Sequence, residues 1–187
     1  LLDGGGFAEG VVLEWGRRLG SADAGDAMVE DHPQIAPDTQ NARLFEGHGE
    51  ICGCETLGAR LFGLSNVFRG AYDVYVYFDA DDGDSSPGAS VRALTDGDTT
   101  YYLDDPDGRS FEGEFVESAS PDPHDPAAGN YVVFRDVIGD EFFVRVKDAE
   151  YETVDLPTIA GLQVVGGPGK DGVVDRARGI YGGDFDR

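Results

Sequence analysis

The sequence has little lysine, little sulfur and no long apolar run, and each scarcity excludes a class of protein. Of its 187 residues, 14 are Lys or Arg, and only Lys147 and Lys170 are lysines, against 37 Asp and Glu. The net charge of −23 repels nucleic acid and anionic membrane surfaces, so we expect neither as a partner. No apolar stretch approaches the roughly 18 residues that predict a membrane-spanning helix, so we expect no membrane insertion.

The excess of acid favours cations, cationic partners or an environment of high salt. A dense carboxylate surface stays hydrated at high salt, where the repulsion between its charges is screened. Few lysines beside many aspartates are typical of a salt-adapted, halophilic protein or of an extracellular protein exposed to Ca²⁺. The alternative interpretation is that the acidity only keeps the protein soluble.

Sulfur is equally scarce. The one methionine is Met28 and the chain begins with Leu1, so we expect a mature or trimmed chain whose signal peptide has been removed. Cys52 and Cys54 are the two cysteines. A disulfide between them would close a strained ring, and zinc would need more ligands than the nearby His48. Buried thiols, a local or intermolecular disulfide and a metal site therefore stay open, and the pair does not identify a compartment.

Short segments of alternating apolar and polar residues are abundant, and they predict β-strands. The clearest is Tyr72–Asp79, whose apolar residues fall on one face of a strand. Turn sequences such as DG, PG and GD separate the segments at roughly 8–12 residues, the spacing of an all-β sandwich or barrel. Further strands are expected in Val11–Trp15, Asn41–Gly47, Thr56–Leu64, Ala89–Leu94, Thr99–Leu103, Phe111–Glu117, Asn130–Asp136, Glu141–Asp148 and Ile159–Val165.

Other segments predict turns, loops and a tail. Asp136–Glu141 contains a Gly-Asp pair that suits a tight turn, so we expect a hairpin there. Ser21–Asp31 is the one short helix candidate. Ser120–Gly129 holds three prolines and is expected to be a loop. We expect residues 1–165 to form one domain and the Gly-rich residues 166–187 to form a tail, which adds an edge strand, contacts an identical subunit or stays mobile.

The order of three segments resembles a known family. These are "YDVYVYFDAD" (Tyr72–Asp81), "GNYVVFRDVIGDEFFVRV" (Gly129–Val146) and "IAGLQVVG" (Ile159–Gly166). The chain is similar here to the jelly-roll, galactose-binding-like β-sandwich modules of secreted and cell-surface bacterial proteins. The resemblance implies an antiparallel jelly-roll sandwich of eight or more strands and a non-enzymatic extracellular module. The cysteine pair, the long loop of residues 16–40 and the tail depart from the family pattern.

The acidic segment that follows Tyr72–Asp79 is the candidate metal site. Ca²⁺ takes six to eight oxygen ligands, and a glycine allows the sharp turn such a loop needs. Position 12 of an EF-hand loop would be Ser90 in place of Glu, so the segment is not an EF-hand. A structural Ca²⁺ site and a solvated acidic turn both stay open. The candidate ligands are Asp79, Asp81, Asp82 and Asp84.

Tyrosines on the expected strands are the candidate ligand-binding residues. Sugars stack on exposed aromatic faces while neighbouring carboxylates and amides bind their hydroxyl groups. The competing interpretation is that these rings belong to the core or form cross-strand pairs. The candidates are Tyr75, Tyr77, Tyr101 and Tyr102.

Motifs for catalysis are nearly absent. Glu46, His48 and Glu50 alternate and would share one face of an extended segment, which makes them the best metal or general-base group. No G-x-S-x-G, Walker or dinucleotide motif accompanies them. We therefore expect no enzyme. Our leading expectation is an extracellular module that binds a glycan or another cell-surface polymer, stabilised by Ca²⁺ if the acidic loop binds it. The alternative is a structural subunit of a filament, surface layer or shell.

Overall fold

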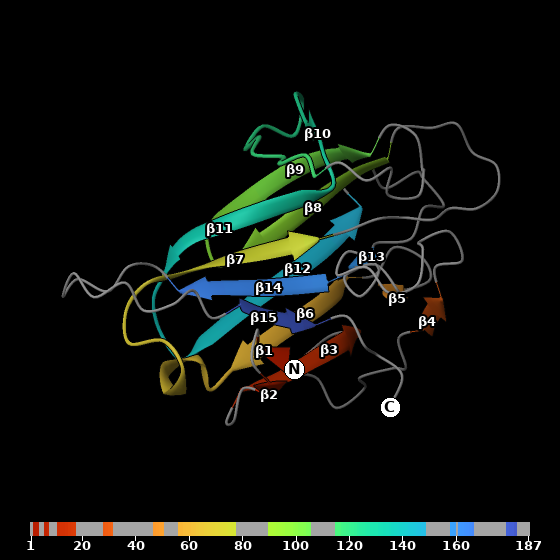
Figure 1. Cartoon of the computed structure of the whole chain (residues 1–187). Coiled ribbons are helices and arrows are strands. Elements are labelled where there is room, and N and C mark those ends of the chain that lie inside the picture. Colours follow the sequence, from red (N-terminus) through yellow and green to blue (C-terminus); the bar gives the residue numbers. More distant parts are fainter. Residues whose placement is uncertain are drawn as a thin grey trace.

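The computed structural model describes residues 2–3, 6–7, 11–17, 28–31, 47–50, 56–77, 90–105, 115–148, 158–159, 161–166 and 179–182. In these ranges the chain is all-β, as the sequence predicted. Two mostly antiparallel sheets pack as a sandwich (Figure 1). The described residues include no α-helix, and none of their helices is long and apolar enough to cross a membrane.

The first sheet has six strands in the order β11-β7-β14-β15-β1-β2. Its centre is β7, which pairs antiparallel with β11 on one side and β14 on the other. Residues 179–182 of the predicted tail form β15, which lies between β14 and β1 of the same chain. The strands are β1 (Leu2–Asp3), β2 (Gly6–Phe7), β7 (Tyr72–Tyr77), β11 (Tyr131–Val137), β14 (Gly161–Gly166) and β15 (Gly179–Gly182).

The second sheet also has six strands, in the order β10-β9-β8-β12-β6-β3. All its pairs are antiparallel except the short parallel pair of β10 with β9. The strands are β3 (Val12–Arg17), β6 (Leu57–Phe62), β8 (Ser90–Asp96), β9 (Thr99–Asp105), β10 (Ala127–Ala128) and β12 (Glu141–Asp148). The two large sheets satisfy the expectation of eight or more strands.

A small third sheet shares no strand with the two large sheets. It joins β13 (Thr158–Ile159), β5 (Gly47–Glu50) and β4 (Met28–Asp31), all antiparallel. The helix predicted for Ser21–Asp31 is wrong for its last four residues, because the backbone of β4 pairs with β5. Residues 21–27 lie outside the described residues.

One hydrophobic core fills the space between the two large sheets. Tyr72, Val74 and Val76 of β7 face Phe142 and its neighbours from the second sheet, all within one cluster of buried residues. Aromatic rings meet across the gap: Phe134 of β11 lies 5.3 Å from the ring centres of both Tyr101 and Phe142. The period-two alternation that predicted these strands therefore also separates their buried face from their outer face.

The hairpin predicted at Asp136–Glu141 is wrong. The turn exists, with Gly139 at φ 130° and Asp136 at φ 55°, but the strands on either side of it belong to different sheets. β11 pairs with β7, whereas β12 pairs with β6 and β8. The apolar residues of both strands face the same core, so the chain crosses between the layers at this turn.

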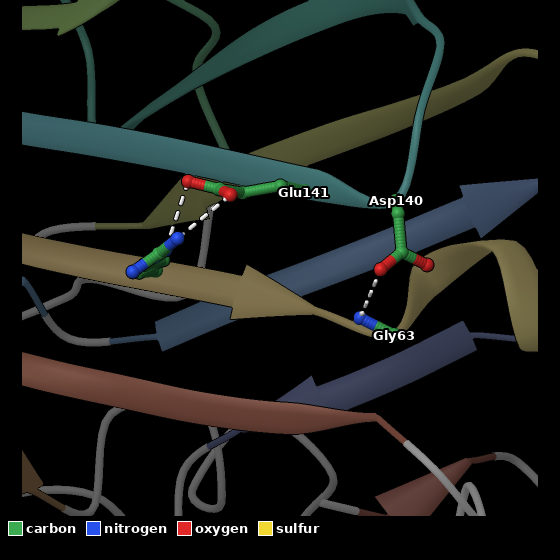
Figure 2. A network of polar contacts seen from close by, with 4 residues as sticks. Gly63, Asp140 and Glu141 are labelled. Carbon is green, nitrogen blue, oxygen red and sulfur yellow. Dashed lines mark hydrogen bonds and ion pairs between the residues drawn. The ribbon is translucent and has the colours of Figure 1, made fainter.

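Polar contacts anchor this crossing to the short 3₁₀ turn η1 (Leu64–Asn66). The Asp140 carboxylate accepts hydrogen bonds from the backbone N–H and the hydroxyl of Ser65. It also accepts a hydrogen bond from the Gly63 N–H at 3.3 Å (Figure 2). Next to it, Glu141 forms a bidentate ion pair with Arg60 of β6, with both N···O distances 2.8 Å. These contacts hold the crossing against the end of β6.

Candidate functional site

The outer face of the first sheet carries a cluster of aromatic side chains. Because Val74 and Val76 of β7 point into the core, Tyr75 and Tyr77 point the opposite way. The register places Tyr131 of β11 opposite Tyr77, and Gln163 of β14 opposite Tyr75. We call Tyr75, Tyr77, Tyr131 and Phe115 the tyrosine face.

The three tyrosine rings of this face lie close together and nearly parallel. The ring centres of Tyr75 and Tyr131 are 6.0 Å apart with an interplanar angle of 29°. Tyr75 and Tyr77 are 6.4 Å apart at 16°, and Tyr77 and Tyr131 are 5.6 Å apart at 35°. Parallel and offset rings at such distances attract one another. The rings therefore form a platform rather than three independent side chains.

Phe115 borders the platform edge-on. Its ring meets Tyr77 at 5.7 Å and 72°, and Tyr131 at 6.4 Å and 73°. Phe115 is 38% exposed and its neighbour Val116 is 42% exposed, whereas Tyr77 is only 6% exposed. Tyr75 and Tyr131 are half-buried. Tyr77 is thus the packed centre of the face, and Tyr75, Tyr131 and Phe115 are the rings that solvent reaches.

The segment that carries Phe115 is fixed by backbone hydrogen bonds at the open edge of the sandwich. Val116 accepts hydrogen bonds from the N–H groups of Asn130 (2.9 Å) and Tyr131 (3.3 Å), and the Ser118 N–H donates to Tyr131 at 2.8 Å. The Ser118 hydroxyl donates to the carbonyl of Tyr102, which belongs to the second sheet. The segment therefore bridges the two sheets and holds Phe115 in place.

Polar groups surround the rings. The Tyr77 hydroxyl donates to the Gln163 side-chain oxygen at 2.7 Å, which fixes that amide beside Tyr75. Arg135 forms a bidentate ion pair with Glu117, with both distances 2.8 Å. The Asp73 carboxylate accepts a hydrogen bond from the Asp136 N–H. An amide, a guanidinium and carboxylates thus surround the rings of the tyrosine face.

The pKa of one phenol of this face, that of Tyr131, lies above its usual value. Burial raises the pKa of Tyr131, and the nearby Glu117 and Tyr75 add to the rise. The Glu117 carboxylate holds the pKa of the Arg135 guanidinium above its usual value. The face therefore offers hydroxyl groups and one fixed cation–anion pair. It offers hydrogen bonding and stacking rather than an ionised nucleophile.

The four tyrosines predicted to bind a ligand do not lie together. Tyr75 and Tyr77 share the tyrosine face. Tyr101 contacts Phe134 and packs against the core between the sheets. Tyr102 lies opposite Ala93 on the outer face of the second sheet. This face is on the other side of the sandwich from Tyr75 and Tyr77. Adjacent residues of one strand point to opposite faces, which separates Tyr101 from Tyr102.

The predicted Ca²⁺ ligands Asp79, Asp81, Asp82 and Asp84 lie outside the described residues, as do Glu46 and the cysteine pair. The backbones of His48 and Glu50 belong to β5 in the third sheet. Within the described ranges, no three His, Cys, Asp or Glu side chains come together in a way that could hold a metal ion.

Sequence reasoning missed Tyr131, Phe115 and Gln163 as members of this face. Each belongs to a segment that predicted a strand, but membership of the face depends on pairing between distant segments. Tyr131 reaches Tyr77 only through the β11–β7 register, and Gln163 reaches Tyr75 only through the β14–β7 register. The signal available was the alternation in Asn130–Asp136, which places Tyr131 on the face opposite to Val132.

Comparison of the chain with protein-family models, with curated proteins and with solved structures gives no match.

Proposed function

We propose that this protein is a non-catalytic, secreted or cell-surface module that binds a glycan or another cell-surface polymer on the tyrosine face. One observation carries the proposal: Tyr75 and Tyr131 lie nearly parallel, half-buried and open to solvent, with the Gln163 amide fixed beside them. Rings that belong only to the core would be buried, whereas Tyr75 and Tyr131 keep part of their surface accessible on the outer face of the sheet.

The chemistry of the face suits a sugar. An aromatic ring supplies a flat apolar surface for the C–H groups of a pyranose, and a few placed polar groups fix its orientation. The amide of Gln163 and the Arg135–Glu117 pair supply such groups around the rings. Because these polar groups are already bonded to protein partners, the ligand would meet a preformed surface.

The polar groups of the face also favour binding over catalysis. A general acid or base needs a titratable group within reach of the substrate and a pKa near the operating pH. Glu117 forms a bidentate ion pair with Arg135, and the Tyr77 hydroxyl donates a hydrogen bond to the Gln163 side chain. These engagements suit orientation of a ligand, so the proposal assigns no catalytic residue.

For the fold, the proposal is a jelly-roll sandwich related to galactose-binding-like modules. Its support is the path of the chain, which passes from β6 in the second sheet to β7 in the first. It then returns to β8 and β9, and alternates again through β11, β12 and β14. Such switching between layers is a feature of Greek-key and jelly-roll connections.

A structural Ca²⁺ at Asp79–Asp84 is part of the proposal. In the sequence, Asp79 stands two residues after Tyr77. A ligand that binds only the folded protein raises its melting temperature with concentration. Ca²⁺ should therefore raise the melting temperature of the wild type and not that of an Asp81→Asn/Asp82→Asn variant. Equal shifts in both proteins would place Ca²⁺ elsewhere, and no shift in either would remove it from the account.

The glycan proposal is tested by binding to a panel of soluble polysaccharides, followed by titration of variants. Tyr75→Ala and Tyr131→Ala should each weaken binding about five- to thirtyfold, because each removes a ring worth about 1–2 kcal/mol of contact. The matched control is Tyr102→Ala, which removes a half-buried tyrosine from the outer face of the second sheet and should leave affinity unchanged. Equal losses in all three variants, or no binding to the panel, would refute the assignment.

A further inference from the structure

The outer face of the second sheet carries two exposed cations from one strand. In β12, Phe142, Val144 and Val146 are buried in the core, so Phe143, Arg145 and Lys147 point outward. Arg145 and Lys147 are both exposed. They are two residues apart on an extended strand, which places them about 7 Å apart along the sheet.

Two other described arginines, both on the outer faces of the large sheets, are neutralised by acids. Arg60 is paired with Glu141 on the same face and lies opposite Glu14, and Arg135 on the other face is paired with Glu117. Arg145 instead stacks on Phe143, with its guanidinium carbon 5.7 Å from the ring centre. Among the described residues, neither Arg145 nor Lys147 has an acidic partner.

The residues around these two cations are neutral. Arg145 lies between Gly58 of β6 and Thr95 of β8, and Lys147 lies opposite Ala93. Tyr102 follows in the same row. In a chain of 37 acidic and 14 basic residues, these surroundings leave a local positive patch within a strongly negative molecule.

We propose that Arg145 and Lys147 dock an acidic segment of a second copy of this chain. Charge complementarity supports this occupant. The chain has 37 acidic residues against 14 basic ones, and Arg145 and Lys147 lack acidic partners among the described residues. The spacing agrees as well, because carboxylates at alternate positions of an extended segment are also about 7 Å apart. In the sequence, Asp79 and Asp81, Asp82 and Asp84, and Asp105 and Asp107 stand two positions apart.

The contact joins two different surfaces, so it is heterologous and extends into chains of subunits unless a rotation closes it. The two cations lie on the opposite face of the sandwich from Tyr75 and Tyr131. The net charge of −23 opposes association over long distances, and salt screens that repulsion beyond a Debye length of about 8 Å at physiological ionic strength. The inference does not depend on the glycan proposal.

Zero-length cross-linking tests the contact directly, because the chain has only two lysines, Lys147 and Lys170. A carbodiimide joins a lysine amine to a carboxylate that touches it. In a mixture of unlabelled and heavy-nitrogen-labelled chains, mixed-isotope peptides identify links between copies. We expect mixed-isotope links from Lys147 to an acidic segment, in clear excess over those from Lys170. Absence of that excess would overturn the proposal.

The mass of two charge-reversal variants, measured by light scattering, gives an independent test. Arg145→Glu should weaken self-association at least about tenfold, because it replaces attraction by repulsion at the contact. The matched control is Arg69→Glu, which makes the same charge change at an exposed arginine after η1. Equal masses for the wild type and both variants at every concentration would contradict the proposal, as would binding of the patch to an acidic polysaccharide by a protein that stays monomeric.

Discussion

Tyr75 and Tyr77 are two positions apart on one strand, yet they contribute differently to the proposed site. Tyr77 is 6% exposed and its hydroxyl is bonded to Gln163, so it supports the face from below. Tyr75 is half-buried and stacks on Tyr131, so its ring is open to a ligand. The difference in burial therefore assigns Tyr77 to the support of the face and Tyr75 to the surface that would contact a ligand.

Gly129 offers a residue-scale test of the bridge that positions Phe115. A Cβ added to Gly129 would lie 2.7 Å from the Val116 carbonyl oxygen and 2.9 Å from the Ser118 nitrogen. Both are backbone atoms of the bridging segment, so they cannot move aside as a flexible side chain would. Gly129→Ala should lower the free energy of unfolding by about 1–3 kcal/mol. Chemical denaturation measures it.

Gly70→Ala is the matched control for that variant, because a Cβ at Gly70 would meet nothing within 4 Å. It should leave stability unchanged or raise it slightly. A Gly129→Ala protein as stable as Gly70→Ala would show that the bridge does not pack as described.

Tyr72 gives a residue-scale prediction at alkaline pH. Burial, with the nearby carboxylates of Asp96 and Asp140, raises the pKa of Tyr72 to about 12. A tyrosine in an unfolded chain ionises near pH 10. The folded state favours the neutral phenol, so its contribution to stability is complete below about pH 10 and is lost as pH rises toward 12.

Titration of tyrosinate absorbance checks this assignment. The late phase of the wild-type titration should lose one tyrosine in a Tyr72→Phe variant, whose core otherwise keeps its shape. Superimposable late phases in the two proteins would contradict the burial of this hydroxyl.

At the scale of the element, Asp140 secures the crossing between β11 and β12. Hydrogen bonds from the Ser65 hydroxyl and N–H lower the pKa of Asp140. A carboxylate with a lowered pKa contributes stability above its unfolded pKa of about 3.9, and this is lost as pH falls through the folded value. Asp140→Asn should therefore lower the melting temperature at neutral pH, and its difference from the wild type should shrink below about pH 4.

Asp98→Asn is the control for Asp140→Asn, because Asp98 is an exposed carboxylate in the turn between β8 and β9. Its melting temperature should follow the wild type at every pH. A gap between Asp140→Asn and the wild type that stays constant down to pH 3 would show that the Asp140 charge does not stabilise the crossing.

The strands were predictable from the sequence, but their partners were not. Alternation within Tyr72–Asp79 and Glu141–Asp148 is local, and it predicted both β7 and β12, and for β7 also the apolar face. The Gly-Asp turn at Asp136–Glu141 is also local, and it suggested a hairpin. That prediction failed because the pairing of β11 and β12 is set by distant strands, which place Phe134 and Phe142 on opposite sides of one core.

The candidate site was predictable only in part for the same reason. Tyr75 and Tyr77 lie within one strand, so their common face follows from period-two alternation. Tyr101 and Tyr102 were candidates as well, because they lie on an expected strand. The register instead sends Tyr101 to the core and Tyr102 to the outer face of the second sheet.

At the scale of the whole molecule, the two outer faces of the sandwich differ in chemistry. The first sheet presents parallel tyrosine rings bordered by an amide and an ion pair. The second presents Arg145 and Lys147, which have no acidic partner among the described residues, on the same face as the Arg60–Glu141 ion pair. Because the sandwich holds these faces back to back (Figure 1), one copy could bind a polymer on one side and an acidic segment of another copy on the other.

The central claim is that the tyrosine face binds a glycan, and amide chemical-shift mapping during titration with a polysaccharide from the panel tests it most directly. The account predicts that the largest shifts fall on β7, β11 and β14, around Tyr75, Tyr131 and Gln163, with β8 and β12 unaffected. Shifts that gather on the second sheet, or no shifts with any member of the panel, would contradict it.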